Sequence, residues 1–236
     1  MKNVKLDYLG HSGFLAETEH VLLMFDAYRG DLSIVCNKPE DKPLFVFVSH
    51  AHADHFDPQI FSLMGRKGGV KYILSFDLCG NPAVPSACEA CYMDADRTYT
   101  VEGLGTVRTL LSTDEGVAYL IRTADCTLFH AGDLHWWDWP GEDPAWLKEQ
   151  ESVFCREIGK LAGIPIDIGF VVLDDRLEQN YARGLEYYMH TTDTRYILPM
   201  HFWKDRSVIE RFKAKHADPA GDTVLLDTAR ETHWEL

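Results

Sequence analysis

The chain has 236 residues, of which 46% are hydrophobic and 25% are charged, an ordinary composition for a globular protein. We expect a single domain over residues 1–236, because this length suits one sizeable core. The formal charge of −14 disfavours a nucleic-acid partner, since an acidic surface repels phosphate backbones, although bound divalent metals add local positive charge. No stretch approaches the roughly 20 apolar residues of a membrane span. The first residues lack the apolar segment of a secretory signal, so we expect a cytoplasmic protein.

Short apolar runs separated by Gly, Asp, Asn and Pro predict β-strands through the first half of the chain. Amphipathic patterns predict three helices in the second half, the first of which begins at Asp143 and Pro144. Strands mixed with such helices favour an α/β or α+β domain, a pair of sheets covered by helices. The predicted strands are residues 4–9, 21–25, 44–48, 72–74, 107–111, 117–121, 127–129, 168–173, 196–198 and 224–226, and the predicted helices are residues 144–161, 178–189 and 207–215.

The densest group of possible metal ligands follows the apolar run 44–48 directly. His50, His52, Asp54 and His55 place three imidazoles and a carboxylate within six positions, and these groups are the usual ligands of divalent first-row metals. Alternation in a strand would point His50, His52 and Asp54 to one face, and a strand that runs into a loop could bring them to one spot. The alternative is a histidine-rich surface turn without metal, but the spacing favours a metal site.

This run resembles the His-x-His-x-Asp-His signature of the metallo-β-lactamase-fold hydrolase superfamily. That superfamily also carries an Asp after an early strand, a lone His, a metal-bridging Asp and a final His. Asp26, Asp133 and His201 match in order, each at the end of an apolar run. The lone His is missing, because no histidine occurs between Phe56 and Phe129, and Asp114 stands in its place. The resemblance implies a four-layer αββα sandwich over nearly the whole chain.

The resemblance also implies the ligand sets of a dinuclear site. His50 and His52 would bind one metal ion, Asp54, His55 and His201 a second, and Asp133 would bridge them. Asp114 either completes the first site or is an ordinary residue of a Ser-Thr-Asp turn. Asp54 would also act as the catalytic group that orients the bridging water or accepts its proton. Asp26 would hold a ligand imidazole by hydrogen bonding, or it is a turn residue at a strand end. The candidate metal ligands are His50, His52, Asp54, His55, Asp114, Asp133 and His201.

Weaker candidates surround this set. His11 resembles a segment near the start of several hydrolases of the superfamily, but a lone loop histidine more often has no such role. Trp136 and Trp137 follow Asp133 closely, and they either form a wall of the substrate pocket or pack on the next helix. The exposed loop that carries them could equally serve a homo-oligomer interface. His130 is expected in the core as a hydrogen-bonded histidine, and residues 174–176 end a strand that could reach the mouth of the site.

Cysteines offer a less specific signal. Cys79, Cys88 and Cys91 lie close together in the sequence, and the last two form a CxxC pair. A structural zinc would need a fourth ligand, which the neighbouring sequence does not supply, so unpaired thiols are the favoured interpretation.

Three functions are compatible with these residues. The favoured one is a hydrolase with two divalent metal ions, Zn, Mn or Fe, that activates water against a small ester, lactone, thioester or phosphodiester. The second is an iron-dependent oxidoreductase on the same fold, and the third is a non-catalytic metal-binding protein. Two imidazoles with the carboxylate of Asp114 form a harder ligand set than three imidazoles, which shifts the preference from zinc toward iron or manganese.

Overall fold

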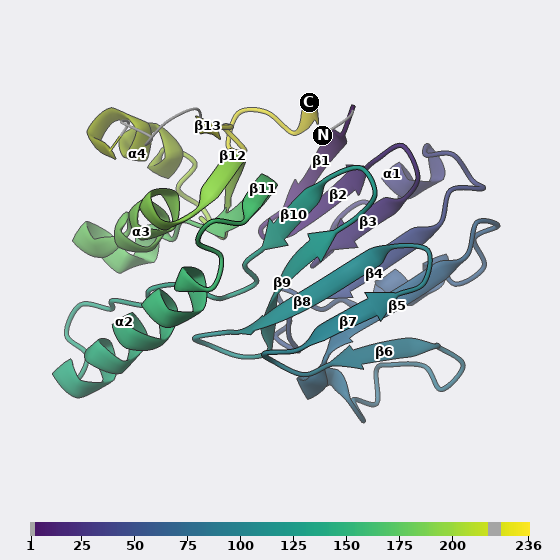
Figure 1. Cartoon of the computed structure of the whole chain (residues 1–236), viewed down its shortest axis with the longest axis horizontal. Helices are drawn as coiled ribbons and strands as arrows, with labels where there is room; N and C mark the ends of the chain where they lie inside the picture. Colours follow the sequence, from purple (N-terminus) through teal and green to yellow (C-terminus); the bar gives the residue numbers. More distant parts are fainter. Residues whose placement is uncertain (1–2, 217–222) are drawn as a thin grey trace.

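A computed structural model describes residues 3–216 and 223–236. The described residues form two mixed β-sheets of seven strands each, packed face to face (Figure 1). The first sheet has the order β14-β1-β2-β3-β4-β5-β6 and the second β13-β12-β11-β10-β9-β8-β7. The strands of the first sheet are β1 (Lys5–Gly10), β2 (Gly13–Glu17), β3 (Leu22–Phe25), β4 (Leu44–Val48), β5 (Val70–Ser75), β6 (Ala90–Met93) and β14 (His233–Glu235). Those of the second are β7 (Thr98–Val101), β8 (Gly105–Leu111), β9 (Val117–Arg122), β10 (Thr127–His130), β11 (Pro165–Val172), β12 (Asp193–Met200) and β13 (Val224–Leu225).

Each sheet contains an antiparallel part and a parallel part. In the first sheet β3, β4, β5 and β6 run parallel, and in the second β10, β11, β12 and β13 do so. Parallel strands are covered on both faces and therefore read as continuous apolar runs. The fully buried run of β4 is an example. The carboxyl ends of β3 and β4, and those of β10, β11 and β12, are the places where the candidate ligands follow.

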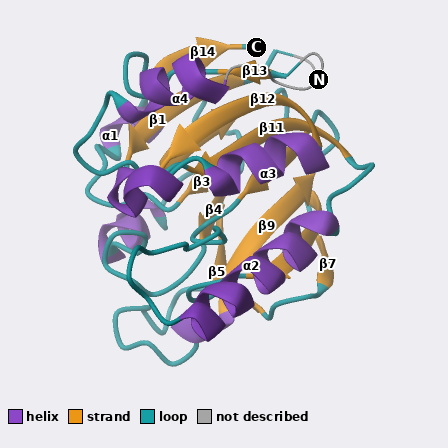
Figure 2. Ribbon diagram, turned by 90° about the vertical axis from the view of Figure 1, so that its left-hand side faces the viewer, coloured by secondary structure: helices purple, strands orange, loops and turns teal. Residues whose placement is uncertain are grey.

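Helices cover the outer faces of the sheets. Figure 2 shows α2 (Pro144–Gly159), α3 (Arg183–Thr191) and α4 (Val208–His216) in front of the second sheet. Asp143 begins α2 as expected, since its carboxylate accepts hydrogen bonds from the backbone N–H groups of Ala145 and Trp146, two of the groups that a helix start leaves unpaired. The first sheet is covered by α1 (Ser33–Cys36) and two 3-10 turns, η1 (Pro58–Leu63) and η2 (Phe76–Leu78). The four-layer αββα sandwich that the resemblance implied is confirmed.

Aromatic side chains join the two sheets across the central core. Phe14 on β2 packs on Phe170 of β11 with ring centroids 4.2 Å apart, and Phe47 on β4 meets Tyr119 of β9 at 5.2 Å. All four side chains are fully buried, and each such ring removes a large apolar area from water. This core fixes the strand ends of one sheet relative to those of the other.

The structure corrects two element predictions. The helix predicted over residues 178–189 begins only at Arg183, because Glu178 has a left-handed backbone with φ of 53° inside the 3-10 segment η3 (Asp175–Asn180). Four strands, β2, β6, β7 and β14, were not predicted, since they are short and their composition is mixed. In the described part of the chain, no helix is long and apolar enough to cross a membrane.

Candidate metal centre

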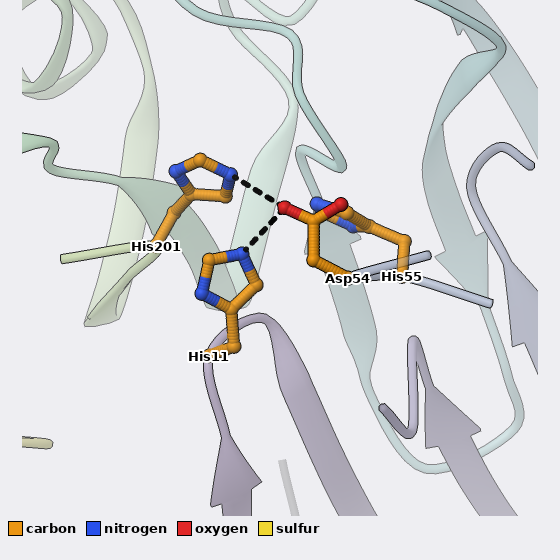
Figure 3. A group of neighbouring side chains, drawn as sticks. All are labelled: His11, Asp54, His55 and His201. Atoms are coloured by element: carbon orange, nitrogen blue, oxygen red, sulfur yellow. Dashed lines mark ion pairs between the residues drawn. The ribbon is translucent and has the colours of Figure 1, made fainter. Parts of the chain in front are cut away.

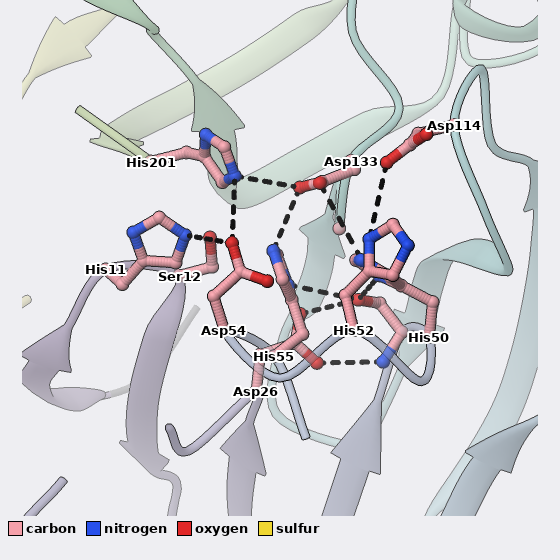
Figure 4. A network of polar contacts seen from close by, with 12 residues as sticks. His11, Ser12, Asp26, His50, His52, Asp54, His55, Asp114, Asp133 and His201 are labelled. Carbon is pink, nitrogen blue, oxygen red and sulfur yellow. Dashed lines mark hydrogen bonds and ion pairs between the residues drawn. The ribbon is translucent and has the colours of Figure 1, made fainter. Parts of the chain in front are cut away.

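The candidate ligands converge at one edge of the sandwich, where loops from both sheets meet (Figure 4). From the first sheet come His11 in the β1–β2 turn, Asp26 after β3 and residues 49–55 after β4. From the second sheet come Asp114 between β8 and β9, Asp133 after β10 and His201 after β12. Parallel strands end at a common edge, so residues far apart in the sequence become neighbours.

Residues 49–55 do not continue the strand. β4 ends at Val48, and the following segment turns, with the backbone N–H groups of His55 and Phe56 both donating to the carbonyl of His52. The strand thus ends near Ser49 and runs into a loop, as predicted, but strand alternation does not reach His50, His52 and Asp54. The turn instead directs His50 and His52 to one group of ligand atoms and Asp54 to another.

Two groups of potential ligand atoms result. His50, His52, Asp114 and Asp133 form the first, and His11, Asp54, His55 and His201 form the second. Within each group the ligand atoms all lie within 4.8 Å of one another. Figure 3 shows the second group, in which His11 and His201 both approach the carboxylate of Asp54. Apart from the addition of His11, this division matches the two ligand sets that the resemblance implied, although binding itself stays a prediction.

Asp133 lies between the two groups. Its Oδ2 is 3.7 Å from Nε2 of His50, while its Oδ1 is 3.1 Å from Nε2 of His55 and 3.4 Å from Nε2 of His201. Burial alone would raise the pKa of Asp133, but His201 and His55 outweigh it and hold that pKa well below its usual range. The carboxylate is thus ionised with one oxygen toward each group, the arrangement that a bridging ligand requires.

Buried nitrogen atoms at the centre make no hydrogen bond. Within the described residues, this holds for Nε2 of His50, His55 and His201, all of which are buried, and for Nε2 of His11. An unsatisfied buried polar atom is costly in a protein interior. Several such atoms that converge on one carboxylate fit an imidazole-bound metal, because an imidazole without a proton on Nε2 offers a lone pair there.

The opposite nitrogen of each buried ring is held by a partner. Nδ1 of His55 donates to Oδ2 of Asp26 at 2.7 Å, and Nδ1 of His201 donates to Oδ2 of Asp174 at 3.0 Å. Ser49 donates its hydroxyl proton to Asp26 at 2.6 Å, so its oxygen accepts from Nδ1 of His50 at 2.9 Å. A proton fixed on Nδ1 leaves Nε2 as the lone-pair nitrogen, which is how proteins prepare histidines for metal. The predicted role of Asp26 in holding an imidazole agrees with this contact.

Charge and burial differ among the rings. Burial, with the neighbouring His55, lowers the pKa of His50 to about 4, which keeps this ring neutral and able to bind metal near neutral pH. For His55, burial alone would lower the pKa, but Asp133 and Asp26 outweigh it and raise the pKa well above its ordinary value. A cation is thus favoured at this position, and a metal ion would replace the proton.

Asp114 and His52 form the open side of the first group. Oδ2 of Asp114 lies 3.5 Å from Nδ1 of His52, and the two side chains are 42% and 44% exposed. Burial, together with the charge of Asp133, raises the pKa of Asp114, because a second carboxylate is unfavourable there without a counter-charge. Asp114 thus lies within reach of the first group of ligand atoms, and its role as a metal ligand stays a prediction.

His11 lies at the site, in contact with two candidate ligands. Its Nε2 lies 3.3 Å from Oδ2 of Asp54, and its ring packs 4.3 Å from that of His201. The backbone N–H of His201 donates to the carbonyl of His11 at 3.2 Å. The close contact with His11 is the main reason that the pKa of Asp54 lies far below its usual value. Asp54 is therefore an ionised carboxylate at the mouth of the second group.

The backbone adopts uncommon conformations at the site. His11, Asp26 and His201 have positive φ angles of 52°, 37° and 66°, a region that residues other than glycine rarely occupy. Such conformations cluster at functional sites, where the surrounding structure holds them. Gly116 also has a positive φ angle of 67°, and it leaves room for the backbone of Ser49, because a Cβ atom at this position would lie 2.0 Å from the Ser49 carbonyl oxygen.

A pocket of about 260 Å³ opens over both groups. Its lining includes the predicted ligands His52, Asp54, Asp114, Asp133 and His201, and also Thr113, Arg176 and three indoles, Trp137, Trp139 and Trp146.

The two tryptophans named from the sequence behave differently. Trp137 lines the pocket, with its indole N–H donating to the carbonyl of Asp133 at 3.1 Å. Trp136 does not line the pocket and packs instead on Phe154 of α2 and Tyr187 of α3. The pocket-wall interpretation is therefore wrong for Trp136, because the chain turns after Asp133 and the two adjacent side chains point apart.

Sequence reasoning missed the roles of Ser49 and Asp174. Both lie just after an apolar strand and hold the imidazole of a candidate ligand, and their position beside the strand end was the available signal. His130 lies buried in the core as expected and bonds the carbonyl of Ser12 at 2.9 Å. Cys79, Cys88 and Cys91 are free thiols, and the described residues place no cysteine in a possible metal group.

Comparison with known families places the chain. The model of a β-lactamase superfamily domain matches residues 5–138, more than half of the sequence. The chain belongs to the β-lactamase superfamily. A UPF0173 metal-dependent hydrolase of Opitutus terrae is 27% identical over 216 residues, which cover 84% of this chain and 85% of that protein. Another of that name from Thermococcus kodakarensis is 26% identical, covering 55% of this chain and 61% of its own length. Both relatives are named metal-dependent hydrolases, which is the class predicted here from the sequence.

Solved structures support the fold. Igni18, a metallo hydrolase from the archaeon Ignicoccus hospitalis, aligns with a TM-score of 0.69 at 16% identity, covering all of this chain and 98% of the other. CmlA, a diiron β-hydroxylase from Streptomyces venezuelae, aligns with a TM-score of 0.64 at 14% identity, covering 99% of this chain and 54% of that one. At these identities the likeness concerns the fold alone, so the chemistry has to be argued from the site.

Proposed function

We propose that this superfamily member is a metal-dependent hydrolase that uses two divalent ions to activate water against a small ester, lactone or phosphodiester. The observation that carries the proposal is the set of buried Nε2 atoms that surround Asp133 without making a hydrogen bond. Their Nδ1 atoms are already engaged, so the Nε2 atoms face the centre and have no hydrogen-bond partner among the described residues.

The residues divide into two holding sets. His50, His52 and Asp114 would hold one ion, and Asp54, His55 and His201 the other, with Asp133 shared between them. His11 adds a fourth nitrogen at the second set. A pair of divalent ions lowers the pKa of a shared water and polarises the scissile bond. The protein supplies the positions of the ligands and the pocket above them.

Asp54 would orient the attacking water and receive its proton. Its Oδ2 is held 3.3 Å from His11 and its side chain lines the pocket. Because its pKa is depressed, the carboxylate stays ionised and can accept a hydrogen bond from water throughout the neutral range.

Asp114 bears on the metal that the first set prefers. An anionic oxygen ligand in place of an imidazole makes the set harder, which favours manganese or iron over zinc. We therefore expect protein purified without added metal to carry manganese or iron, as measured by elemental analysis. Stoichiometric zinc with neither of the other two would contradict this part of the proposal.

A combined metal and substrate screen tests the function. The protein is reconstituted with Zn²⁺, Mn²⁺ or Fe²⁺, its metal content is measured, and hydrolysis of bis-p-nitrophenyl phosphate, lactones and thioesters is followed. We expect two equivalents of metal and turnover of at least one class. His201→Ala should remove activity, whereas His190→Ala, which changes an exposed histidine of α3, should keep it. Fully loaded protein that turns over none of these classes would argue for a metal-binding protein without hydrolase activity.

The carboxylate at position 114 also favours a second candidate, an iron-dependent oxidoreductase, because harder ligand sets suit iron. Iron-loaded protein that is coloured and consumes oxygen in the presence of a reductant would support this function. Iron-loaded protein that consumes no oxygen but hydrolyses an ester would exclude it.

A further inference from the structure

Among the described residues, one arginine and no lysine line the pocket over the candidate metal centre. Arg176 lies at the start of η3, directly after the turn that follows β11, and it lines the pocket together with Asp54, Asp133 and His201. Its side chain is 43% exposed, which leaves part of the guanidinium open to a ligand. An arginine in a pocket whose other charged residues are carboxylates and potential ligands calls for an explanation.

Arg176 is held rigidly. Its Nε donates to Oδ1 and Oδ2 of Asp174 at 2.9 and 3.0 Å, and Nη2 donates to Oδ2 as well. The guanidinium also lies over two indoles, 5.3 Å from the ring centroid of Trp139 and 5.0 Å from that of Trp203. Cation–π contacts and a bidentate ion pair both fix the orientation of the guanidinium plane.

Part of the guanidinium has no partner. Asp174 engages Nε and Nη2, whereas the described residues provide no hydrogen bond to Nη1. Arginine carries five N–H donors in a fixed plane, so the end of the fork away from Asp174 keeps free donors. A fixed fork with free donors matches the two oxygens of a carboxylate or phosphate.

The indoles beside Arg176 form an apolar wall. Trp137 and Trp139 are stacked with ring centroids 5.7 Å apart and planes within 2° of parallel, and both line the pocket. Trp146 lines it from α2 and is 37% exposed. The pocket thus combines flat apolar surface with one cation, a combination suited to a substrate that has both an apolar part and a negative charge.

A purely supporting role would leave these features unused. If Arg176 served only to hold Asp174, and through it His201, the ion pair would suffice and neither the free Nη1 nor the adjoining indole surface would be needed. Arg211 is a matched arginine outside the pocket. It pairs with Asp205, lies over the ring of Tyr181 and is 42% exposed, but it does not line this pocket, so it serves as a control.

We propose that Arg176 is a specificity-determining residue that binds an oxyanion of the substrate, a carboxylate or a phosphate, remote from the bond that is cleaved. Trp137 and Trp139 would contact the apolar part of the substrate, between its oxyanion and the bond that is cleaved. The inference rests on the proposed hydrolase, since it assigns the class of substrate to the same site. The substrate class is then an ester, lactone or phosphodiester with an additional negative group.

Matched esters test this assignment. The ratio of kcat/KM for p-nitrophenyl hydrogen adipate to that for p-nitrophenyl hexanoate is measured in wild type, Arg176→Gln, Arg176→Lys and Arg211→Gln. Because both esters are compared in one protein sample, the ratio does not depend on the fraction of metal-loaded enzyme. We expect the ratio to fall about tenfold in Arg176→Gln, to recover partly in Arg176→Lys and to stay at the wild-type value in Arg211→Gln. An unchanged ratio in Arg176→Gln overturns the proposal.

Binding gives a readout that is independent of turnover. Tryptophan fluorescence of the metal-loaded protein is titrated with phenylacetate, phenylphosphonate and the neutral phenylacetamide, and metal content is measured for every variant. We expect one or both anions to bind more tightly than the amide, and Arg176→Gln to weaken only the anions, about tenfold; a difference between the two anions tells carboxylate from phosphate. Equal affinities of Arg176→Gln and wild type for the anions overturn the proposal. If wild type hydrolyses no ester but Arg176 still governs anion binding, the proposed hydrolysis fails while the anion site stands.

Discussion

Replacing Asp26 by asparagine should disable one half of the metal centre without removing any ligand. Asp26 is 1% exposed, its Oδ1 accepts from the backbone N–H of Ser49 at 2.8 Å, and its Oδ2 accepts from Nδ1 of His55 at 2.7 Å. In Asp26→Asn the amide oxygen would keep the first bond, so the NH₂ group would face His55. Two donors cannot share one hydrogen bond, and the His55 proton would have to move to Nε2, the atom that faces the candidate metal.

The expected magnitude follows from that tautomer change. Removing the partner that orients a ligand histidine typically weakens metal affinity by about 10- to 100-fold, which corresponds to about 1.4 to 2.8 kcal/mol. The loss should be largest in the second ligand set, to which His55 belongs. The first set should weaken less, because the Ser49 hydroxyl loses Oδ2 of Asp26 as its acceptor but keeps the oxygen that accepts from His50. A competition titration with a fluorescent chelator measures the metal affinity of each set. We expect two similar affinities in wild type and one clearly weaker affinity in the variant.

Ser49→Ala is the matched control. It keeps the bond between Asp26 and His55 but removes the hydroxyl that accepts from Nδ1 of His50 at 2.9 Å. The weakened affinity should then belong to the first ligand set. If Asp26→Asn binds both equivalents of metal as tightly as wild type, the tautomer reasoning is refuted, and so is the assignment of His55 as a ligand through Nε2.

Three further predictions concern other parts of the chain. Asp114→Ala should lower metal occupancy from two equivalents to about one, as measured by elemental analysis, and full occupancy with full activity would mark Asp114 as an ordinary turn residue. Gly116→Ala should destabilise the fold by about 3 kcal/mol, because it combines a positive φ with a contact of 2.0 Å to the carbonyl of Ser49. For a chain of this size that lowers Tm by roughly 6 to 12 °C in calorimetry, while Gly159→Ala, which meets no atom within 4 Å, should leave Tm unchanged or higher. Native protein treated with iodoacetamide should stay unmodified at Cys126 by mass spectrometry, because burial raises the pKa of this thiol to about 12, and rapid alkylation there would contradict its buried position.

The order of the ligands along the chain could be predicted from residue types and apolar runs alone. His50, His52, Asp54 and His55 form a local motif, and Asp133 and His201 follow apolar runs that became β10 and β12. The carboxyl ends of parallel strands lie at one edge of a sheet, so possible ligands that follow several apolar runs point to a common site there.

Other parts of the site could not be predicted because they depend on side-chain direction. Nothing in the sequence separates Trp136 from its neighbour Trp137, yet one packs on α2 and α3 and the other lines the pocket. Asp174 gave only a weak signal, and its contact with His201 exists because β11 and β12 are parallel neighbours.

The sequence by itself determined the kind of chemistry and the class of fold, because residue type and spacing decide which groups can bind metal and which runs become buried strands. The tertiary structure decided how those groups divide into two sets, which nitrogen of each imidazole faces the centre, and which side chains surround the pocket. These are matters of distance between residues far apart in the chain, and such distances are set only when the two sheets pack around their common core.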